Sequence, residues 1–194
     1  FLDLDDPLEL FKSWMAEAEK KEIRDPTASS LATANSAGQP DVRMLLLKGL
    51  SSRGFVFYTN YNSRKAKEIV ENPRGSIAVH WLLSKRQVRM EGHIERIDGA
   101  ESDSYFENRP REAQLETWAS RQSEIIVDRA WLGCRWRKYD AQFQEKVPRP
   151  NWWGGYRLVP DAMEFWQQGE NRMHDRLLYE KCEDGGWSRK RLAP

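Results

Sequence analysis

The sequence of 194 residues contains only two cysteines, Cys134 and Cys182, which lie far apart and form no CxxC pair. This spacing argues against a disulfide framework or a zinc site and favours a reducing cytosol. The sequence also lacks a secretory signal and an apolar run long enough to span a bilayer. We therefore predict a cytoplasmic protein with no membrane partner. Because the sequence opens at Phe1, we expect a leader or arm to precede it.

An excess of either charge is also missing. There are 31 Lys and Arg residues and 30 Asp and Glu residues, so the net charge is +1. This balance, without a contiguous basic stripe, argues against a nucleic-acid partner. The hydrophobic content of 39% and charged content of 31% fit a globular protein with its own core. We predict that residues 1–194 form a single domain.

Several common catalytic motifs are absent from the sequence. It contains no P-loop, no GxGxxG fingerprint and no GxSxG elbow. The three histidines, His80, His93 and His174, show no HxxxH spacing, so we predict no metal site. No pair of carboxylates is marked out for glycoside hydrolysis.

Short apolar stretches separated by turn residues predict a mainly β protein with peripheral helices, an α+β chain built on an antiparallel barrel. Asp6, Pro7 and Glu9 are typical of a helix start and predict a helix over about residues 6–22. We expect strands at 27–34, 42–48, 54–59, 76–82 and 87–97, a short helix at 63–70, a helical insertion over about 98–145 and three short closing strands around Tyr156, Phe165 and Leu177, with a last piece near Trp187.

The segment from Glu164 to Arg176 carries the strongest functional pattern. Arg172, His174 and Arg176 are spaced two apart, so they would share one face of an extended strand. Such a cationic cluster is costly to bury unless an anion or an electron-rich ligand binds it. The alternative is a solvated strand face with ordinary ion pairs, and spacing alone does not decide between them.

Two further patterns point to anion binding. Ser63, Arg64 and Lys65 stand where a helix should begin, and free N–H groups with adjacent cations could hold a phosphate. Tyr105 and Arg109 lie four apart on an expected helix and could present one phosphate-binding face. Both patterns also occur on ordinary solvated helices.

Three polar positions at strand and helix junctions could read the edge of a heteroaromatic ring. They are Gln87, Gln122 and Ser123, which could equally be turn or cap residues. Arg43 and Lys48 flank an apolar strand and should face opposite sides of it. Charged residues that flank a buried strand often only extend to solvent.

Taken together, the motifs resemble the pyridoxine (pyridoxamine) 5′-phosphate oxidase family over almost the whole sequence. Each motif is weak alone, but many occur in the family's order. They include Arg43-Met-Leu-Leu-Leu-Lys48, Phe57-Tyr-Thr-Asn60, Ser63-Arg-Lys65, Asn72-Pro73, Arg86-Gln-Val-Arg89, Tyr105-Phe106, Arg109-Pro110, Trp118-Ala-Ser120, Gln122-Ser123, Trp153-Gly-Gly-Tyr156, Glu164-Phe-Trp-Gln167, Arg172-Met-His-Asp-Arg176 and Arg191-Leu-Ala-Pro194.

The resemblance implies an FMN-binding split β-barrel of antiparallel Greek-key type, acting as a homodimer with FMN at the interface. It implies FMN contacts by Arg43, Met44, Leu45, Leu46, Leu47, Lys48, Tyr58, Thr59, Arg64, Lys65, Gln87, Gln122, Ser123, Trp166 and Arg176. It implies substrate contacts by Lys48, Tyr105, Arg109, Arg172, Met173 and His174, with Arg172 and His174 beside the reacting carbon.

The implied activity is oxidation of pyridoxine or pyridoxamine 5′-phosphate to pyridoxal 5′-phosphate, with oxygen as acceptor and hydrogen peroxide as product. Pyridoxine phosphate would react directly, and pyridoxamine phosphate through an imine that hydrolyses. Two alternatives remain. One is a related split-barrel flavoenzyme acting on another reduced heterocycle, and the other is a module that binds FMN or pyridoxal phosphate without turnover.

Three positions depart from the family pattern. Ala113 replaces a usual Ser on the substrate phosphate; such a hydrogen bond is worth roughly 1.5–3 kcal/mol, so we expect weaker substrate binding. Glu116 replaces a usual Gly and brings a negative charge near the phosphate site. Gln168 also replaces a usual Gly, and this would cost conformational free energy if the backbone there has a positive φ. Asp25 matches a family position near the site.

Overall fold

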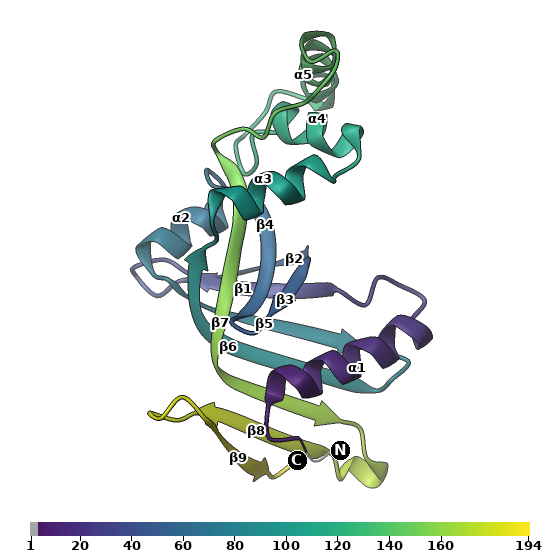
Figure 1. Cartoon of the computed structure of the whole chain (residues 1–194), viewed down its shortest axis with the longest axis vertical. Coiled ribbons are helices and arrows are strands. Elements are labelled where there is room, and N and C mark those ends of the chain that lie inside the picture. Colours follow the sequence, from purple (N-terminus) through teal and green to yellow (C-terminus); the bar gives the residue numbers. More distant parts are fainter. Residues whose placement is uncertain (1–3) are drawn as a thin grey trace.

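A single curled antiparallel sheet dominates the computed structural model, which describes residues 4–194 (Figure 1). Phe1 and the arm expected before it lie outside the described residues. The strand order is β2-β1-β5-β6-β7-β4-β3, and β8 pairs with both β7 and β9. The strands are β1 (Ala28–Ala34), β2 (Pro40–Leu46), β3 (Gly49–Ser51), β4 (Gly54–Asn60), β5 (Arg74–Trp81), β6 (Arg86–Arg96), β7 (Trp153–Gln167), β8 (Asp175–Lys181) and β9 (Trp187–Leu192).

The helices lie around this sheet, so the predicted mainly β architecture with peripheral helices is confirmed. Three of them, α3, α4 and α5, occupy the region expected as a helical insertion and gather at one end of the molecule (Figure 1). The helices are α1 (Pro7–Lys21), α2 (Arg64–Glu71), α3 (Gly99–Glu107), α4 (Arg111–Ala119) and α5 (Arg129–Gln142), with a short 3₁₀ helix η1 (Glu170–Arg172).

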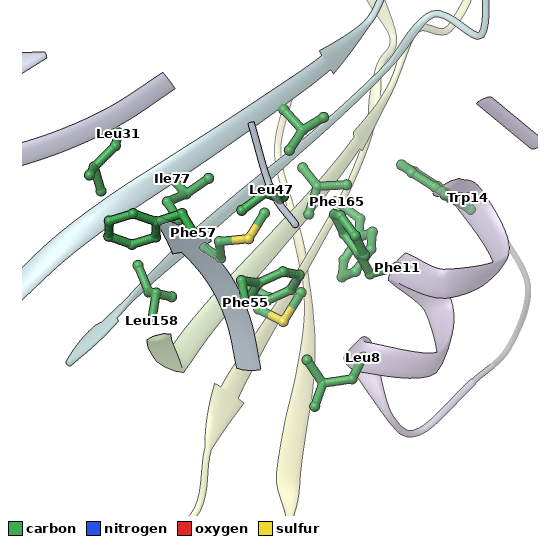
Figure 2. Close-up of a cluster of buried hydrophobic side chains, with 14 of the residues drawn as sticks. Leu8, Phe11, Trp14, Leu31, Leu47, Phe55, Phe57, Ile77, Leu158 and Phe165 are labelled. Carbon is green, nitrogen blue, oxygen red and sulfur yellow. The ribbon is translucent and has the colours of Figure 1, made fainter. Parts of the chain in front are cut away.

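Helix α1 begins as the sequence predicts and covers the core beside β4, β5 and β7. Asp6 caps it by accepting a hydrogen bond from the Leu8 backbone N–H at 2.8 Å. Phe11 packs edge-on against Phe55, with ring centres 4.8 Å apart. Trp14 packs in the same way against Phe165 at 5.2 Å. Figure 2 shows the side chains of α1 directed into the buried cluster that the sheet encloses.

The prediction of separate strands around Tyr156 and Phe165 is wrong, because both residues belong to the one long strand β7. Between them lies Pro160, which cannot donate a hydrogen bond to a neighbouring strand. The structure accommodates it at a register shift, where Gly92 of β6 faces Pro160. The first part of β7 pairs with β4 and the second part with β8. This strand therefore connects two regions of the molecule.

The helical insertion expected over about residues 98–145 is interrupted. Helix α4 ends at Ala119, and α5 begins only after Asp128, which caps it by accepting from the Trp131 N–H at 2.8 Å. Ser123, inside the interruption, has a positive φ of 73° that a helix does not allow. Residues 120–128 therefore form a loop between α4 and α5.

Candidate active site

A pocket of about 330 Å³ opens between the end of β2, strand β4, helix α2 and helices α3 and α4. It brings together many of the positions that the sequence marks. Its lining residues are Met44, Leu45, Leu46, Lys48, Tyr58, Thr59, Asn60, Lys65, Tyr105, Arg109, Glu116, Thr117, Ser120, Gln122 and Trp153. Leu47, predicted with its neighbours to contact a flavin, does not line the pocket among the described residues and packs in the hydrophobic core.

Lys65 places a buried positive charge at the pocket, where α2 begins. Its side chain is only 9% exposed, and burial lowers the pKa of its ammonium group. The ammonium donates to the Thr59 hydroxyl at 3.2 Å and to the Gln122 side-chain oxygen at 3.4 Å. Both acceptors are neutral, and the adjacent helix N-terminus adds a partial positive charge. This corner of the pocket is therefore suited to bind an anion.

The loop of residues 120–128 supports this corner. Gln122 accepts hydrogen bonds from the Thr59 hydroxyl at 3.0 Å and from Lys65. The Ser123 hydroxyl accepts from the Arg64 backbone N–H at 3.2 Å, at the first turn of α2. A positive φ in a serine is uncommon and is found where the surrounding structure enforces it. The loop thus fixes Gln122 and Ser123 against α2.

Arg43 and Arg64 are held in a network with two carboxylates beside this corner. Arg43 pairs with Asp41 at 2.6 Å and with Glu68 at 3.2 Å. Arg64 pairs with Glu68 at 2.9 Å and with Asp41 at 3.2 Å. Glu68 is buried, and it also accepts a hydrogen bond from Thr33 at 2.5 Å. The side chain of Arg64 remains 57% exposed, so it can reach a ligand at the start of α2.

Stacked aromatic rings form one wall of the pocket. Tyr58 and Tyr105 stack at 3.7 Å between ring centres with an interplanar angle of 7°, and Trp153 stacks on Tyr58 at 5.4 Å. Desolvation by burial raises the pKa of Tyr58 to about 12, so its hydroxyl stays protonated. Sequence reasoning gave Trp153 no role at the site, although it opens the quoted Trp153-Gly-Gly-Tyr156 motif.

Arg109 lies over this wall, but it follows the end of α3 at Glu107, so it does not share a helix with Tyr105 as the four-residue spacing predicted. Its guanidinium sits 4.7 Å from the centre of the Trp153 ring and donates to the Thr117 hydroxyl at 2.7 Å. Burial lowers the pKa of Arg109, which nevertheless remains a cation at neutral pH. With Lys48, it gives the pocket a second cationic side. Thr117 is a further contact that the sequence patterns did not reveal.

A second group of predicted residues lies at the other end of β7. Gln87 on β6 faces Trp166 on β7, which faces Arg176 on β8. The Trp166 ring lies 4.8 Å from the imidazole of His174. Arg176 pairs with the buried Glu164 at 2.8 Å. The three predicted flavin contacts Gln87, Trp166 and Arg176 therefore form one row across three strands.

The expectation that Arg172, His174 and Arg176 share the face of one strand is wrong. Arg172 ends the 3₁₀ helix η1 with a positive φ of 64°, and Asn171 has a φ of 51°. These left-handed residues break the alternation, and only Arg176 lies in β8. Arg172, Met173 and His174 instead form a tight turn, in which Met173 is 71% exposed.

The backbone of this turn is tightly constrained at Gly169. A Cβ atom there would lie 1.8 Å from the carbonyl oxygen of Met173, so only glycine fits. The Gly169 N–H donates to Nδ1 of His174 at 3.3 Å, which fixes the imidazole. The strain considered for Gln168 is absent, because no positive φ is found there, and its N–H donates to the Lys85 carbonyl oxygen at 3.0 Å.

One chain does not bring the two groups together. Trp153 in the pocket and Trp166 in the second group are separated by 13 positions along β7, or roughly 40 Å at about 3.3 Å per strand residue. Figure 1 shows β7 running from the helical end of the molecule to the end that carries β8 and β9.

The described residues show neither a metal-binding group nor a membrane-spanning helix. Among residues 4–194, no three His, Cys, Asp or Glu side chains are grouped so as to hold a metal ion. In the same part of the chain, every helix is too short or too polar to cross a membrane.

Comparison with known structures supports the fold. The structure of PhzG from Burkholderia lata 383, in complex with tetrahydrophenazine-1-carboxylic acid, matches with a TM-score of 0.94 and 32% identity, over 100% of this chain and 95% of that chain. A pyridoxamine 5′-phosphate oxidase-related, FMN-binding protein from Nostoc punctiforme matches with a TM-score of 0.77 and 18% identity, over 97% and 98% of the two chains. The predicted split β-barrel is thereby confirmed.

Comparison of sequences identifies the family. The chain is 47% identical to the pyridoxine/pyridoxamine 5′-phosphate oxidase of Ralstonia pickettii, over 97% of this chain and 89% of the relative. It is 45% identical to that of Paraburkholderia phymatum, over 100% and 93%. Residues 15–143 match the family model "Pyridoxamine 5′-phosphate oxidase", and residues 153–194 match "Pyridoxine 5′-phosphate oxidase C-terminal dimerisation region". Both the pocket and the second group fall within these matches, and the chain belongs to the pyridoxamine 5′-phosphate oxidase family.

Proposed function

We propose that the protein is an FMN-dependent oxidase that converts pyridoxine or pyridoxamine 5′-phosphate to pyridoxal 5′-phosphate, reducing oxygen to hydrogen peroxide. The observation that carries this proposal is the pocket, in which Lys48, Tyr105 and Arg109 converge next to the anion-binding corner at Lys65. Two phosphate-binding regions in one pocket suit a phosphorylated cofactor beside a phosphorylated substrate. The names of relatives at 45–47% identity agree with this substrate class.

The corner at Lys65 fits the phosphate of FMN. Lys65 offers a buried ammonium with neutral partners, Arg64 offers an exposed guanidinium, and the start of α2 offers backbone N–H groups. Met44, Leu45 and Leu46 line the same pocket with apolar surface for a flavin ring. When bound, the flavin supplies the redox chemistry: it accepts a hydride from the substrate C4′ carbon and is reoxidised by oxygen.

The protein side chains bind and orient the substrate. Lys48, Tyr105 and Arg109 would hold its phosphate, with Arg109 kept in place by Thr117 and the Trp153 ring. Arg172 and His174 would orient the pyridine ring, and the Gly169 N–H already fixes the His174 imidazole. Asp25 would act only indirectly. Its carboxylate accepts hydrogen bonds from Thr27, which lower its pKa.

We propose a homodimer in which the second group of one copy completes the pocket of the other. Gln87, Trp166 and Arg176 would then contact FMN, and Arg172, Met173 and His174 the substrate, from across the interface. Residues 153–194, which match the dimerisation region, include most of this group. An exposed apolar row on edge strand β2, formed by Val42, Met44 and Leu46, offers a surface for the second copy.

We also propose that residues 1–194 form one domain that works in the cytoplasm. Both family matches lie on one continuous sheet, with β7 joining its two regions. Cys134 and Cys182 are both free thiols, which suits a reducing compartment.

A flavin spectrum tests the proposed function. The purified protein is expected to take up FMN and to lose the oxidised flavin absorbance when pyridoxine 5′-phosphate is added without oxygen. Admission of air should restore the absorbance and yield hydrogen peroxide with pyridoxal 5′-phosphate. Failure to take up FMN would exclude the proposal, and FMN uptake without bleaching would indicate a binding module.

Replacing Lys65 with methionine is expected to weaken FMN binding by about 10- to 100-fold. The change removes a charge-assisted hydrogen bond worth roughly 1.5–3 kcal/mol to the phosphate. Titration of flavin fluorescence gives the dissociation constant. Lys67→Met is the matched control, because Lys67 is an exposed lysine on the same helix. Riboflavin, which lacks the phosphate, should bind both variants alike; an equal loss for riboflavin would refute the phosphate contact.

One observation favours a second candidate function, oxidation of another reduced heterocycle. The PhzG structure, which resembles this chain over its whole length, holds tetrahydrophenazine-1-carboxylic acid. Side-by-side turnover of pyridoxine 5′-phosphate and this reduced phenazine by the same flavin-loaded protein would distinguish the two. A higher kcat/KM for the phenazine would replace our proposal.

A further inference from the structure

The pocket contains one charge that opposes an anionic ligand. Glu116 is the only acidic side chain among the described residues that line it, whereas Lys48, Lys65 and Arg109 are all cationic. Glu116 lies on α4, next to Thr117, whose hydroxyl accepts the hydrogen bond from Arg109 at 2.7 Å. The carboxylate therefore stands on the same side of the pocket as the cation proposed to hold the substrate phosphate.

Glu116 also interacts with Arg109 through its charge. Burial lowers the pKa of Arg109, and the nearby Tyr105 and Glu116 oppose this shift. None of the ion pairs found among the described residues joins Glu116 to a cation within 4 Å, and the residue is exposed. Its charge thus acts at the pocket without being cancelled by direct contact with a cation.

We infer that Glu116 is a specificity-determining residue. Its carboxylate shifts the preference of the pocket toward substrates whose head group carries less negative charge. This inference rests on the proposed function. A phosphate monoester carries about −1.5 to −2 charges at pH 7. Coulomb repulsion scales with ligand charge, so the carboxylate penalises a doubly charged head group about twice as much, in free energy, as a singly charged one. The pocket thereby tolerates phosphate but favours a carboxylate or a phosphodiester more than its cations alone would.

The test compares two ligands that differ by one charge. These are pyridoxal 5′-phosphate and the methyl ester of its phosphate, each measured by direct binding to the flavin-loaded protein. In Glu116→Gln, which keeps the side-chain shape, we expect about fourfold tighter binding of the phosphate and about twofold tighter binding of the ester. KM for pyridoxine 5′-phosphate should fall more than kcat changes. High salt should reduce these gains, because it screens the charge.

Glu112→Gln is the matched control. Glu112 is an exposed acid in the first turn of the same helix and does not line the pocket. This variant has the same net charge as Glu116→Gln, so its affinities should stay close to those of the original protein. Equal gains for both ligands, or equal gains in both variants, would overturn the inference.

The result also separates this inference from the proposed function. If the original protein binds pyridoxal 5′-phosphate but does not oxidise pyridoxine 5′-phosphate, the oxidase proposal fails while the binding comparison still tests Glu116. If it binds neither ligand, both proposals are overturned.

Discussion

Replacing Arg172 with alanine is expected to lower the turnover of pyridoxine 5′-phosphate by about 10²- to 10³-fold, the effect of removing one positioned polar group beside a reacting centre. The same change should leave FMN affinity within about twofold. Arg172 ends η1 and would contact the substrate, whereas the FMN phosphate would be held at the anion-binding corner by Lys65. The two functions should therefore respond separately.

Single-turnover flavin reduction and flavin titration, made on the same preparation, check this separation. Arg53→Ala serves as the control, because Arg53 has an exposed side chain that pairs with Glu95 on the surface. Such pairs contribute little to stability. Parallel loss of FMN binding and turnover in Arg172→Ala would contradict the assigned division of roles.

Replacing Trp14 with alanine is expected to lower the free energy of unfolding by about 3–5 kcal/mol, as for other buried aromatic residues. Trp14 is 1% exposed, packs against Phe165, and lies under the guanidinium of Arg86 at 4.4 Å from its ring centre. Removal would leave a cavity between α1 and the sheet. The loss is a large part of the about 5–15 kcal/mol that typically stabilises a folded protein.

Urea unfolding followed by circular dichroism, at one protein and one FMN concentration, measures this change, since ligand and subunit binding both shift apparent stability. Ile23→Ala is the control, because Ile23 is 91% exposed and its truncation creates no cavity. A loss below about 1 kcal/mol for Trp14→Ala would show that α1 is not part of the cooperative core.

Local features of the sequence predicted most of the fold. Asp6 and Pro7 marked the start of α1 because a cap acts on its own first turn. The strand expected over residues 87–97 matches β6, in which the apolar residues Val88, Met90 and Ile94 are all buried. The continuity of β7 through Pro160 could not be predicted in this way. Whether proline ends a strand or lies in a bulge depends on the partner strand, here β6.

The candidate site was predicted less completely, for two physical reasons. Ser123 and Arg172 adopt left-handed backbone conformations that neither residue type favours, so tertiary packing rather than local preference sets them. The wall of Tyr58, Tyr105 and Trp153 joins β4, α3 and β7, which no spacing along the sequence connects. The family resemblance predicted which residues belong to the site. Only the structure shows that the pocket residues and the second group lie apart within one chain.

The length of β7 has a genetic consequence under the proposed dimer. Each site would take its pocket from one chain and its Arg172 turn from the other, because these features lie at opposite ends of the strand. A chain damaged at Lys65 and a chain damaged at Arg172 could then pair. One site of the mixed dimer would carry both defects and the other would carry neither. Two alleles that are each inactive alone would restore part of each other's activity.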